Sequence, residues 1–487
     1  MASEAPHFVL FPLMAQGHMI PMMDIAKILV HRNVIVTVVT TPHNAARFTS
    51  IIDRYIESGF PIRLVQLQFP CEEAGVPDGC ESLDMIPSLA AATATSFFKA
   101  AQLLQQPAEK LFEELTPPPS CIISDMCLPY TTQIAKKFNV PRISFVGVSC
   151  FCLLCMHNIN IHNIRESVTS ESEYFVLPGI PDKIEMTQAQ AGKPMSESWK
   201  QINEEIREAE MYSYGVVMNS FEELEPAYAT GYKKIRGDKL WCIGPVSLIN
   251  KDHLDNAQRG KASIDVSQHI KWLDCQKPGT VIYACLGSLC NLTTPQLIEL
   301  GLALESSERP FIWVIREGGH SEELEKWIKE YGFEERTNAR SLVIRGWAPQ
   351  LLILAHPAIG GFITHCGWNS TLEAICAGVP MLTWPLFADQ FLNESLVVLV
   401  LKVGVKVGVE IPLTWGKEVE IGVQVKKKDV ERAIAKLMDE TSESEERRKR
   451  VRELAEMANR AVEKGGSSYS NLTLLIQDIM QKNKIDV

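Results

Sequence analysis

Short apolar runs alternate with longer stretches of helically spaced apolar residues in the first part of the chain. His7 to Leu13 is an apolar run, the turn AQGHMIP follows it, and apolar residues recur at helical spacing from Ile20 to Val30. The next run, VIVTVVTT, is strand-like, and the same order returns from CIISD through a helix to VPRISFVGV. This repeated order of strand, helix and strand predicts a parallel sheet covered by helices.

A polar tract without periodicity, Ser247 to Gln268, interrupts this order and is typical of a linker or an exposed loop. Beyond it VIYACLG predicts a strand, Thr294 and Pro295 predict the N-cap and first residue of a helix, and FIWVI predicts the next strand. Because the alternation restarts, we expect a second Rossmann-like half.

The chain length agrees with this division. A chain of 487 residues exceeds the size at which one core keeps growing, so two domains of roughly 200 to 250 residues are expected. The expected boundaries are a first domain over residues 1–246, a linker over 247–268, a second domain over 269–465, and a C-terminal helix over 466–487 that packs back on the first domain.

Composition and charge exclude several classes of protein. The net charge of −11 argues against a protein that neutralises phosphates along a nucleic acid. Glu4 stands where a secretory signal carries positive charge, and the longest apolar stretches, Ile143 to Met156 and Leu396 to Val409, are too short to span a membrane. The 13 cysteines are odd in number and lack framework spacing, so we expect reduced thiols and a cytoplasmic protein.

Metal chemistry finds little support in the sequence. Cys152, Cys155 and His157 form a metal-like cluster, but a structural zinc needs a fourth ligand and usually a second ligand pair. The acidic pair DxD, which can hold Mg²⁺ or Mn²⁺, is absent from the chain. We therefore expect no metal and no cofactor.

The segment from Trp347 to Gln390 carries the densest chemistry. Within it GFIT predicts a strand, HCG a turn, and NSTLEAICA a helix closed by Gly378 and Pro380. A strand, a glycine turn and a helix start present backbone N–H groups and the positive end of a helix dipole, which together hold phosphate. The segment therefore predicts a pyrophosphate site.

Side chains of this segment suit a nucleotide. His365, Asn369 and Ser370 can donate to phosphate oxygens, at about 1.5 to 3 kcal/mol for each bond to the charged group. Glu373 would repel phosphate and therefore suits ribose hydroxyls, whereas Trp347 offers a face for a base, worth roughly 1 to 3 kcal/mol. Taken singly, the tryptophans are more often core residues and a histidine more often caps a helix, but their density in one segment favours a site.

Two residues outside this segment suit acid–base chemistry. His18 follows the first strand, and a neutral histidine titrates near the working pH of a general base, although a lone loop histidine is more often merely exposed. Asp125 ends the strand CIISD, at the sheet edge where ligands bind in open α/β sheets, although it can equally cap a helix.

The 347–390 segment resembles the plant secondary product glycosyltransferase box, the signature of the plant family 1 UDP-glycosyltransferases. It matches over its whole length, including HCGWNSTLE and the terminal FADQ. The resemblance extends over nearly the whole chain, from LFPLMAQGHMIP through SDMCLPYT and CLGS to GGSS. It is closest to the group D members, which act on flavonoids, triterpenoids and related hydroxylated metabolites.

The resemblance implies an α/β protein of the GT-B fold, in which two Rossmann-like domains face each other across a cleft. The donor binds the C-terminal domain, the acceptor binds the N-terminal domain, and Asp125 fixes the tautomer of the base His18. The donor residues that the resemblance implies are Trp347, Ala348 and Gln350 for uracil and ribose, Glu373 for ribose, Ser288, His365, Gly367, Asn369 and Ser370 for the diphosphate, and Trp368, Asp389 and Gln390 for the sugar.

The expected reaction is an in-line displacement with inversion at C1, in which a hydroxyl of a small hydrophobic acceptor attacks a UDP-sugar. Trp368 and Gln390 match the glucose-preferring pattern, so UDP-glucose is the expected donor and hexosyl transfer the expected activity. Acceptor contacts are expected from Pro87 to Phe98 and from Phe145 to Met156. The expected protein is a monomer without a nucleic-acid partner.

Other nucleotide-binding classes fit less well. GxGxxG does not follow the first strand and GxxxxGK[ST] is absent, which argues against a nicotinamide dehydrogenase and a P-loop kinase. The alternatives that stay open are transfer of glucuronic acid or another sugar, a UDP-sugar epimerase, and a UDP-sugar-binding protein that transfers nothing.

Overall fold

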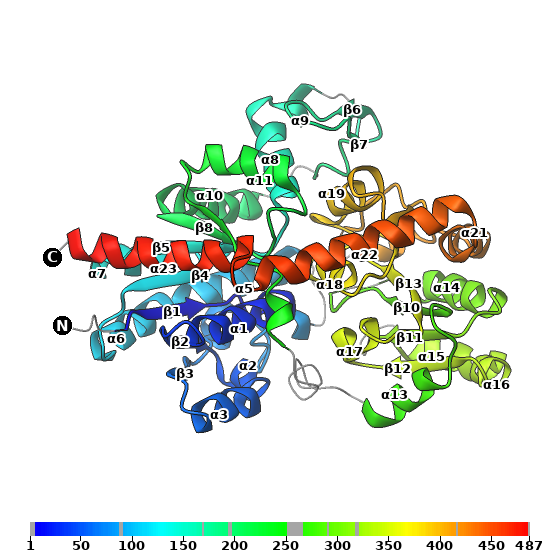
Figure 1. Ribbon diagram of the computed structural model, residues 1–487, viewed down its shortest axis with the longest axis horizontal. Coiled ribbons are helices and arrows are strands. Elements are labelled where there is room, and N and C mark those ends of the chain that lie inside the picture. Colours follow the sequence, from blue (N-terminus) through cyan, green and yellow to red (C-terminus); the bar gives the residue numbers. More distant parts are fainter. Residues whose placement is uncertain are drawn as a thin grey trace. The chain divides into compact units, whose positions relative to one another are not determined.

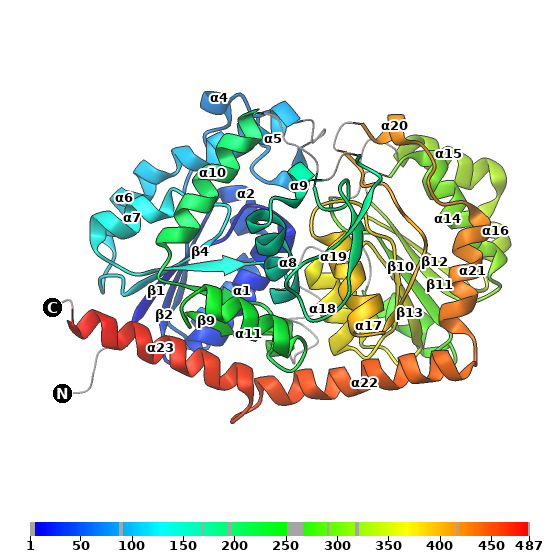
Figure 2. The same ribbon diagram turned by 90° about the horizontal axis from the view of Figure 1, so that it is seen from above.

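The computed structural model describes residues 5–86, 91–167, 170–192, 197–250, 266–289, 292–316, 321–414 and 417–485. The chain forms two compact units, shown in Figures 1 and 2. The first unit comprises residues 1–147, 194–255 and 460–487, and the second comprises residues 148–193 and 256–459.

A seven-stranded parallel sheet forms the centre of the first unit, in the order β3-β2-β1-β4-β5-β8-β9. All five residues of β1 are buried, as expected for a strand covered by helices on both faces. The strands are β1 (His7–Phe11), β2 (Ile35–Thr40), β3 (Ile62–Gln66), β4 (Cys121–Asp125), β5 (Arg142–Val146), β8 (Gly215–Met218) and β9 (Leu240–Cys242).

Helices alternate with these strands along the chain, as in a doubly wound fold. They are α1 (Gln16–Val30), α2 (Pro42–Ala46), α3 (Thr49–Glu57), α4 (Cys71–Ala74), η1 (Leu83–Met85), α5 (Ala91–Leu103), α6 (Gln105–Glu114), α7 (Thr131–Phe138), α10 (Glu197–Tyr212), α11 (Pro226–Ile235), η2 (Val246–Ile249) and α23 (Ser467–Ile485).

The second unit repeats this plan with a six-stranded parallel sheet, in the order β12-β11-β10-β13-β14-β15. Its strands are β10 (Val281–Cys285), β11 (Phe311–Ile315), β12 (Ser341–Arg345), β13 (Ile359–Thr364), β14 (Met381–Thr383) and β15 (Gly404–Lys406). A separate antiparallel hairpin consists of β6 (Tyr174–Val176) and β7 (Glu185–Thr187).

The remaining helices belong to the second unit, except that α22 ends in residues of the first. They are α8 (Cys150–Ile161), α9 (Ile164–Ser167), α13 (Val266–Asp274), α14 (Thr294–Ser306), α15 (Ser321–Tyr331), α16 (Phe333–Thr337), α17 (Gln350–Leu354), α18 (Trp368–Cys376), α19 (Gln390–Ser395), the π-helical η3 (Leu396–Val400), α20 (Glu418–Ile421), α21 (Lys427–Met438) and α22 (Ser442–Val462).

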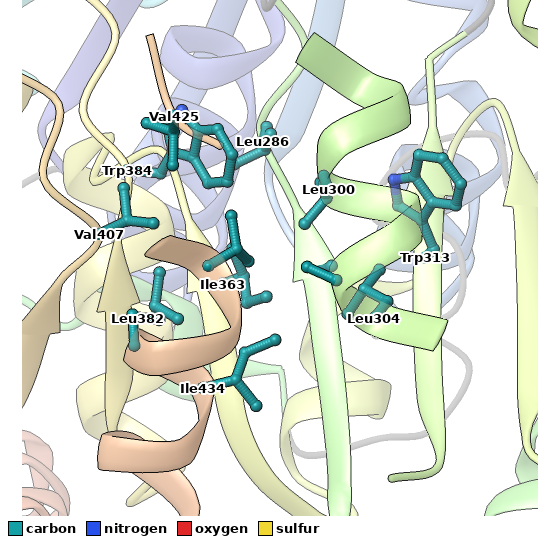
Figure 3. Close-up of a cluster of buried hydrophobic side chains, with 14 of the residues drawn as sticks. Leu286, Leu300, Leu304, Trp313, Ile363, Leu382, Trp384, Val407, Val425 and Ile434 are labelled. Carbon is teal, nitrogen blue, oxygen red and sulfur yellow. The ribbon is translucent and has the colours of Figure 1, made fainter. Parts of the chain in front are cut away.

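A single apolar cluster holds the second sheet to its helices (Figure 3). Leu300 and Leu304 of α14 and Ile434 of α21 pack against strand residues such as Ile363 and Leu382. All five side chains are almost fully buried, which stabilises each by about 1.5 to 3 kcal/mol relative to exposure. The cluster therefore holds α14 and α21 against the sheet.

Two helices pack in a different unit from the one that precedes them in the chain. Helix α8 follows β5 of the first unit, but it packs against α19 of the second. Helix α23 ends the chain and packs on β9 of the first unit (Figure 2). There the Arg32 guanidinium stacks 3.4 Å over the Tyr469 ring, and Lys239 Nζ lies 2.7 Å from Asp478 Oδ2.

Two sequence predictions need correction at element ends. AQGHMIP is not a turn, because α1 begins at Gln16, so His18 lies in the first helical turn with Pro21 in the second. Pro21 lies inside the helix and has no N–H, so the hydrogen bond that this position would donate to the Gly17 carbonyl is missing. The N-cap before α14 is Thr293, which makes Thr294 the first helical residue.

The start of the expected linker is also not an exposed loop. Ser247 and Asn250 are both 6% exposed, and residues 251–265 lie outside the described residues. The Asn250 amide donates to Asp24 Oδ1 (3.0 Å) and its oxygen accepts a hydrogen bond from Lys27 Nζ. Lys27 and Asp24 form a buried ion pair at 3.1 Å. Asn250 is buried because its amide completes the hydrogen bonding of these two buried charges.

Replacing Lys27 by methionine is expected to destabilise the first unit by about 3 to 5 kcal/mol, because it removes the cation beside the buried Asp24 carboxylate. Urea denaturation followed by circular dichroism measures the loss. The double variant Lys27→Met, Asp24→Leu should recover most of it, because no buried charge remains.

Lys137→Met is the matched control, because Lys137 pairs with Glu109 at 2.9 Å but is 46% exposed. It should change the free energy of unfolding by less than about 1 kcal/mol. Equal losses in the two single variants would contradict the role assigned to the buried pair.

Candidate active site

His18 and Asp125 meet where the strand order of the first sheet reverses. Strands β1 and β4 are neighbours, with Phe11 paired to Ser124, although more than a hundred residues separate them. β2 lies on the other side of β1, so the connections after β1 and β4 leave in opposite directions and open a crevice at the carboxyl ends. His18 Nδ1 lies 2.7 Å from Asp125 Oδ2 in this crevice.

The hydrogen bond fixes the tautomer of His18. An ionised carboxylate can only accept, so Nδ1 carries the hydrogen and Nε2 is the basic nitrogen. The His18 side chain is 34% exposed whereas Asp125 is 0% exposed, so a substrate can approach the imidazole while the carboxylate stays behind it. This arrangement can accept a proton and then stabilise the imidazolium.

Asp125 is itself held in place by its surroundings. Its Oδ1 accepts a hydrogen bond from the Cys127 backbone N–H at 3.0 Å. The buried Arg142 guanidinium lies 3.5 Å from the Asp125 carbonyl oxygen and donates to Thr131 Oγ1 at 2.8 Å. The carboxylate orientation is thus determined by two contacts, one of them with His18, and the strand end by a buried cation.

The second unit carries the strand, turn and helix that the sequence predicts around His365. Strand β13 ends at Thr364, Cys366 has a φ of 65°, and α18 begins at Trp368 with Gly367 as its N-cap. His365 follows β13 and Ser288 follows β10, and these neighbouring strands flank the reversal of strand order in this sheet. The structure therefore places both residues at the second crevice.

Two glycines form a slot for the His365 ring. A Cβ on Gly287 would lie 2.6 Å from His365 Nε2, and one on Gly367 would lie 2.4 Å from the same atom. Gly287 also has a φ of +85°, which side chains other than glycine rarely adopt. Gly287 was not predicted as a site residue from the sequence, although it lies two residues after the end of β10.

The His365 imidazole is neutral at physiological pH. Burial lowers its pKa from 6.5 to about 4, because a buried cation loses its hydration. Its buried Nδ1 has no hydrogen-bond partner among the described residues. A neutral imidazole can donate a hydrogen bond without carrying a charge.

Gln350, Ser370 and Glu373 form one hydrogen-bonded group. Gln350 Nε2 donates to Ser370 Oγ at 3.1 Å and to Glu373 Oε2 at 2.8 Å. The reversed amide would place an acceptor against the carboxylate, so this orientation is the chemically sensible one. Both N–H groups of Gln350 are thereby used within the protein. Its oxygen accepts the Tyr283 hydroxyl at 3.5 Å, which leaves one lone pair for a ligand.

The three tryptophans of the segment differ in exposure. Trp347 is half-buried between β12 and α17, next to the buried Ala348. Trp368 is 2% exposed at the first position of α18, so its indole packs in the protein. Trp384 is a core residue, as Figure 3 shows. Asn369 and Ser370 are half-buried in the first turn of α18.

Asp389 and Gln390 begin α19. Gln390 Oε1 accepts the backbone N–H groups of Leu386 (2.8 Å) and Phe387 (3.1 Å), which turns its nitrogen away from this loop. Asp389 Oδ2 accepts from Asn393 Nδ2 at 2.6 Å. Asn393 lies three residues beyond the recognised segment, and no sequence signal pointed to it.

Metal and membrane features can be stated for the described part of the chain. No group of three or more histidine, cysteine or acidic side chains there is arranged to hold a metal ion. No helix in those residues combines the length and the apolar character that a bilayer span requires.

These units and crevices define a class of protein. Two Rossmann-like units, each built on a parallel sheet, are those of a GT-B glycosyltransferase. Residues 265–411 match the family model described as "UDP-glucoronosyl and UDP-glucosyl transferase".

Relatives and solved structures extend the match over the whole chain. UDP-glycosyltransferase 73C11 of Barbarea vulgaris is 56% identical over 98% of this chain and 96% of its own, and 73C6 of Arabidopsis thaliana gives the same values. UGT73P12 of Glycyrrhiza uralensis, complexed with glycyrrhetinic acid 3-O-monoglucuronide, superposes with a TM-score of 0.90 at 37% identity, covering 99% and 97% of the two chains. Arabidopsis UGT89C1 with UDP-L-rhamnose gives 0.76 at 28% identity, covering 98% and 100%. The chain belongs to the plant family 1 UDP-glycosyltransferases and is an enzyme of that class.

Gly367→Ala is expected to weaken UDP binding by about 10- to 100-fold, because the added methyl displaces the His365 ring that it would meet at 2.4 Å. Gly367 has a φ of −59°, which alanine adopts without strain, so the effect is steric. Calorimetry with UDP measures it. In a His365→Ala background the same substitution should change the affinity little, and an undiminished effect there would contradict the slot.

Acid should destabilise the wild type more than His365→Asn. The pKa of His365 is about 4 in the folded protein and 6.5 in the unfolded chain. As the pH falls from 6.5 to 4, the unfolded chain therefore binds a proton at this residue that the folded protein does not bind. His365 therefore costs nothing above pH 6.5 and on the order of 1 to 2 kcal/mol at pH 5. Melting temperatures of both proteins at pH 7.5 and pH 5 test this, and a difference that is the same at both values would contradict it.

Proposed function

We propose that the protein is an inverting UDP-sugar-dependent O-glycosyltransferase that moves glucose from UDP-glucose to a hydroxyl of a small hydrophobic plant metabolite. The observation that carries the proposal is the 2.7 Å contact between His18 Nδ1 and Asp125 Oδ2. A protein that only binds a nucleotide sugar needs no exposed imidazole with a buried carboxylate behind it.

His18 acts as the general base. An acceptor hydroxyl must lose its proton as it attacks C1, and Nε2 of His18 takes that proton while Asp125 stabilises the imidazolium. UDP leaves with its electron pair, so one bond forms at C1, one breaks, and the configuration inverts.

The donor roles follow from the second unit. The uracil stacks on Trp347 beside the Ala348 backbone, and the ribose hydroxyls donate to Glu373 and to the Gln350 oxygen. The diphosphate accepts from the start of α18, where the geometry supports the roles assigned to Ser288, His365, Gly367, Asn369 and Ser370. The sugar contacts are Asp389, the Gln390 nitrogen and the Trp368 backbone.

The similar structures support the acceptor and donor classes. UGT73P12 binds a glucuronide of a triterpenoid acid, and UGT89C1 has been solved with quercetin, a flavonoid. We therefore place flavonoids and triterpenoids first in the acceptor panel. UDP-glucose is favoured by Gln390, and UDP-glucuronic acid is the second donor because the UGT73P12 complex contains a glucuronide.

Further expectations extend this proposal. At the proposed diphosphate site the helix dipole, the backbone donors and a neutral histidine take the place of a metal ion. We therefore expect activity without Mg²⁺. Most of the twelve cysteines among the described residues are buried, and their thiols support a reducing compartment such as the cytoplasm. We also propose that the enzyme acts as a monomer.

Hexosylated product is expected when the protein is incubated with UDP-glucose and an aglycone panel in EDTA, with detection by mass. His18→Ala should lower kcat by about 10²- to 10⁴-fold and leave the Kd of UDP within about twofold. Asp125→Asn should cause a loss of similar size, and the double variant no more than the larger single loss, because both residues serve one proton transfer.

His31→Ala is the matched control, because His31 caps the opposite end of α1 and packs on Phe60. It should leave kcat unchanged. Absence of product with every donor and acceptor would favour a binding protein, epimerised UDP-sugar would favour an epimerase, and normal turnover by His18→Ala would remove the base role.

A further inference from the structure

Asn393 connects two parts of the donor site. It is 0% exposed in α19 and donates through Nδ2 to Asp389 Oδ2 at 2.6 Å and to the Cys366 carbonyl at 2.9 Å. Asp389 is the proposed sugar contact, and Cys366 lies between His365 and Gly367 in the phosphate turn. One side-chain amide therefore holds elements that are 23 residues apart in the sequence.

The chemistry of these contacts allows only one amide orientation. A carboxylate and a carbonyl both accept, so the NH₂ group must face them, and the amide oxygen then accepts from Ser149 Oγ at 3.3 Å. Ser149 is the N-cap of α8, where its Oγ accepts the Cys152 N–H at 3.0 Å. Asparagine thus has each of its hydrogen-bonding groups matched, and no other residue of this size supplies two donors and one acceptor.

The contacts also secure an unfavourable backbone. Cys366 has a φ of 65°, and a residue other than glycine in this region costs roughly 1 to 2 kcal/mol. Asn393 and Thr364 Oγ1, which accepts the Cys366 N–H at 3.2 Å, bond both polar backbone groups of that residue. Loss of the amide would therefore free the turn as well as the Asp389 carboxylate.

We propose that Asn393 is a positioning residue that orients Asp389 toward the sugar of the donor and thereby sets the enzyme's discrimination among hexoses. The proposal rests on the proposed function, in which Asp389 contacts that sugar. Asn393 itself does not touch the substrate; it acts through the carboxylate that it holds.

Asn393→Ala removes both donations, and Asn393→Asp additionally places a second carboxylate against Asp389. We expect kcat/KM for UDP-glucose to fall about 10- to 100-fold in Asn393→Ala, and further in Asn393→Asp, because a hydrogen bond to a charged group is lost. The Kd of UDP, which lacks the sugar, should rise by a smaller factor. The preference for UDP-glucose over UDP-galactose should narrow.

Asn471→Asp is the matched control. Asn471 is 6% exposed on α23 and its Nδ2 likewise donates to a carboxylate, Glu222 Oε1 at 2.9 Å, and to a carbonyl, Cys242 O at 3.1 Å. Its contacts involve no donor residue, so it should lower the melting temperature but leave kcat/KM and hexose preference unchanged. If Asn393→Asp fails to fold, Asn393→Ala carries the test.

A double-mutant cycle distinguishes positioning from a structural role. If Asn393 acts through Asp389, Asn393→Ala should add little to the loss of kcat/KM that Asp389→Ala causes alone. Additive losses, or an Asn393→Ala variant with the hexose preference of the wild type, would overturn the proposal. If the wild type transfers no sugar, the proposed function fails, and the same cycle measured as Kd of UDP-glucose relative to UDP still decides the role of Asn393.

Discussion

Parallel pairing between strands far apart in the sequence is the constraint on which both functional crevices depend. The pairing of β1 with β4 brings the residues after Phe11 next to Asp125, and the pairing of β10 with β13 aligns Cys285 with Thr364. A shift of either register by one residue would turn alternate side chains to the other face of the sheet. The buried strands prevent such a shift, because their apolar residues fill both faces. Catalytic geometry is therefore a consequence of core packing.

Polar groups in the donor site are held in fixed orientations by their partners. Gln390 uses its oxygen on two backbone N–H groups, Gln350 uses its nitrogen on Ser370 and Glu373, and glycines confine the His365 ring. Each arrangement leaves a defined atom for the ligand. Binding then costs little reorganisation of the protein, which is the condition under which hydrogen bonds contribute most to catalysis.

Local patterns predicted the structure best where a single element carried the signal. The strands FIWVI and VIYAC and the helix of the HCGWNSTLE segment lie where the sequence placed them. Properties that depend on partners distant in the chain were not readable. Nothing near Asn250 indicates that Asp24 and Lys27 bury it, and nothing near Cys150 indicates that α8 packs with α19.

The candidate site shows the same division between local and tertiary information. Residue types and spacing pointed to His18, Asp125 and the donor segment, and the resemblance to a known family supplied their roles. Trp368 was expected to contact the sugar, but the sequence did not indicate that its indole is buried, because only tertiary packing decides whether the first residue of a helix faces inward. Asn393 was not predicted, because the sequence does not show which two acceptors an asparagine in a short helix contacts.

The state of His365 bears on how the proposed leaving group is stabilised. In the proposed reaction negative charge grows on the diphosphate as the bond to C1 breaks, so a donor contributes to catalysis only if it gains more from UDP than from UDP-sugar. A permanent cation would bind both states strongly. A neutral imidazole whose pKa burial holds near 4 donates a hydrogen bond without a full charge, and the low dielectric around it strengthens that bond as the charge on the phosphate increases. The glycine slot at Gly287 and Gly367 thus has a chemical consequence, since the burial that it permits keeps His365 neutral.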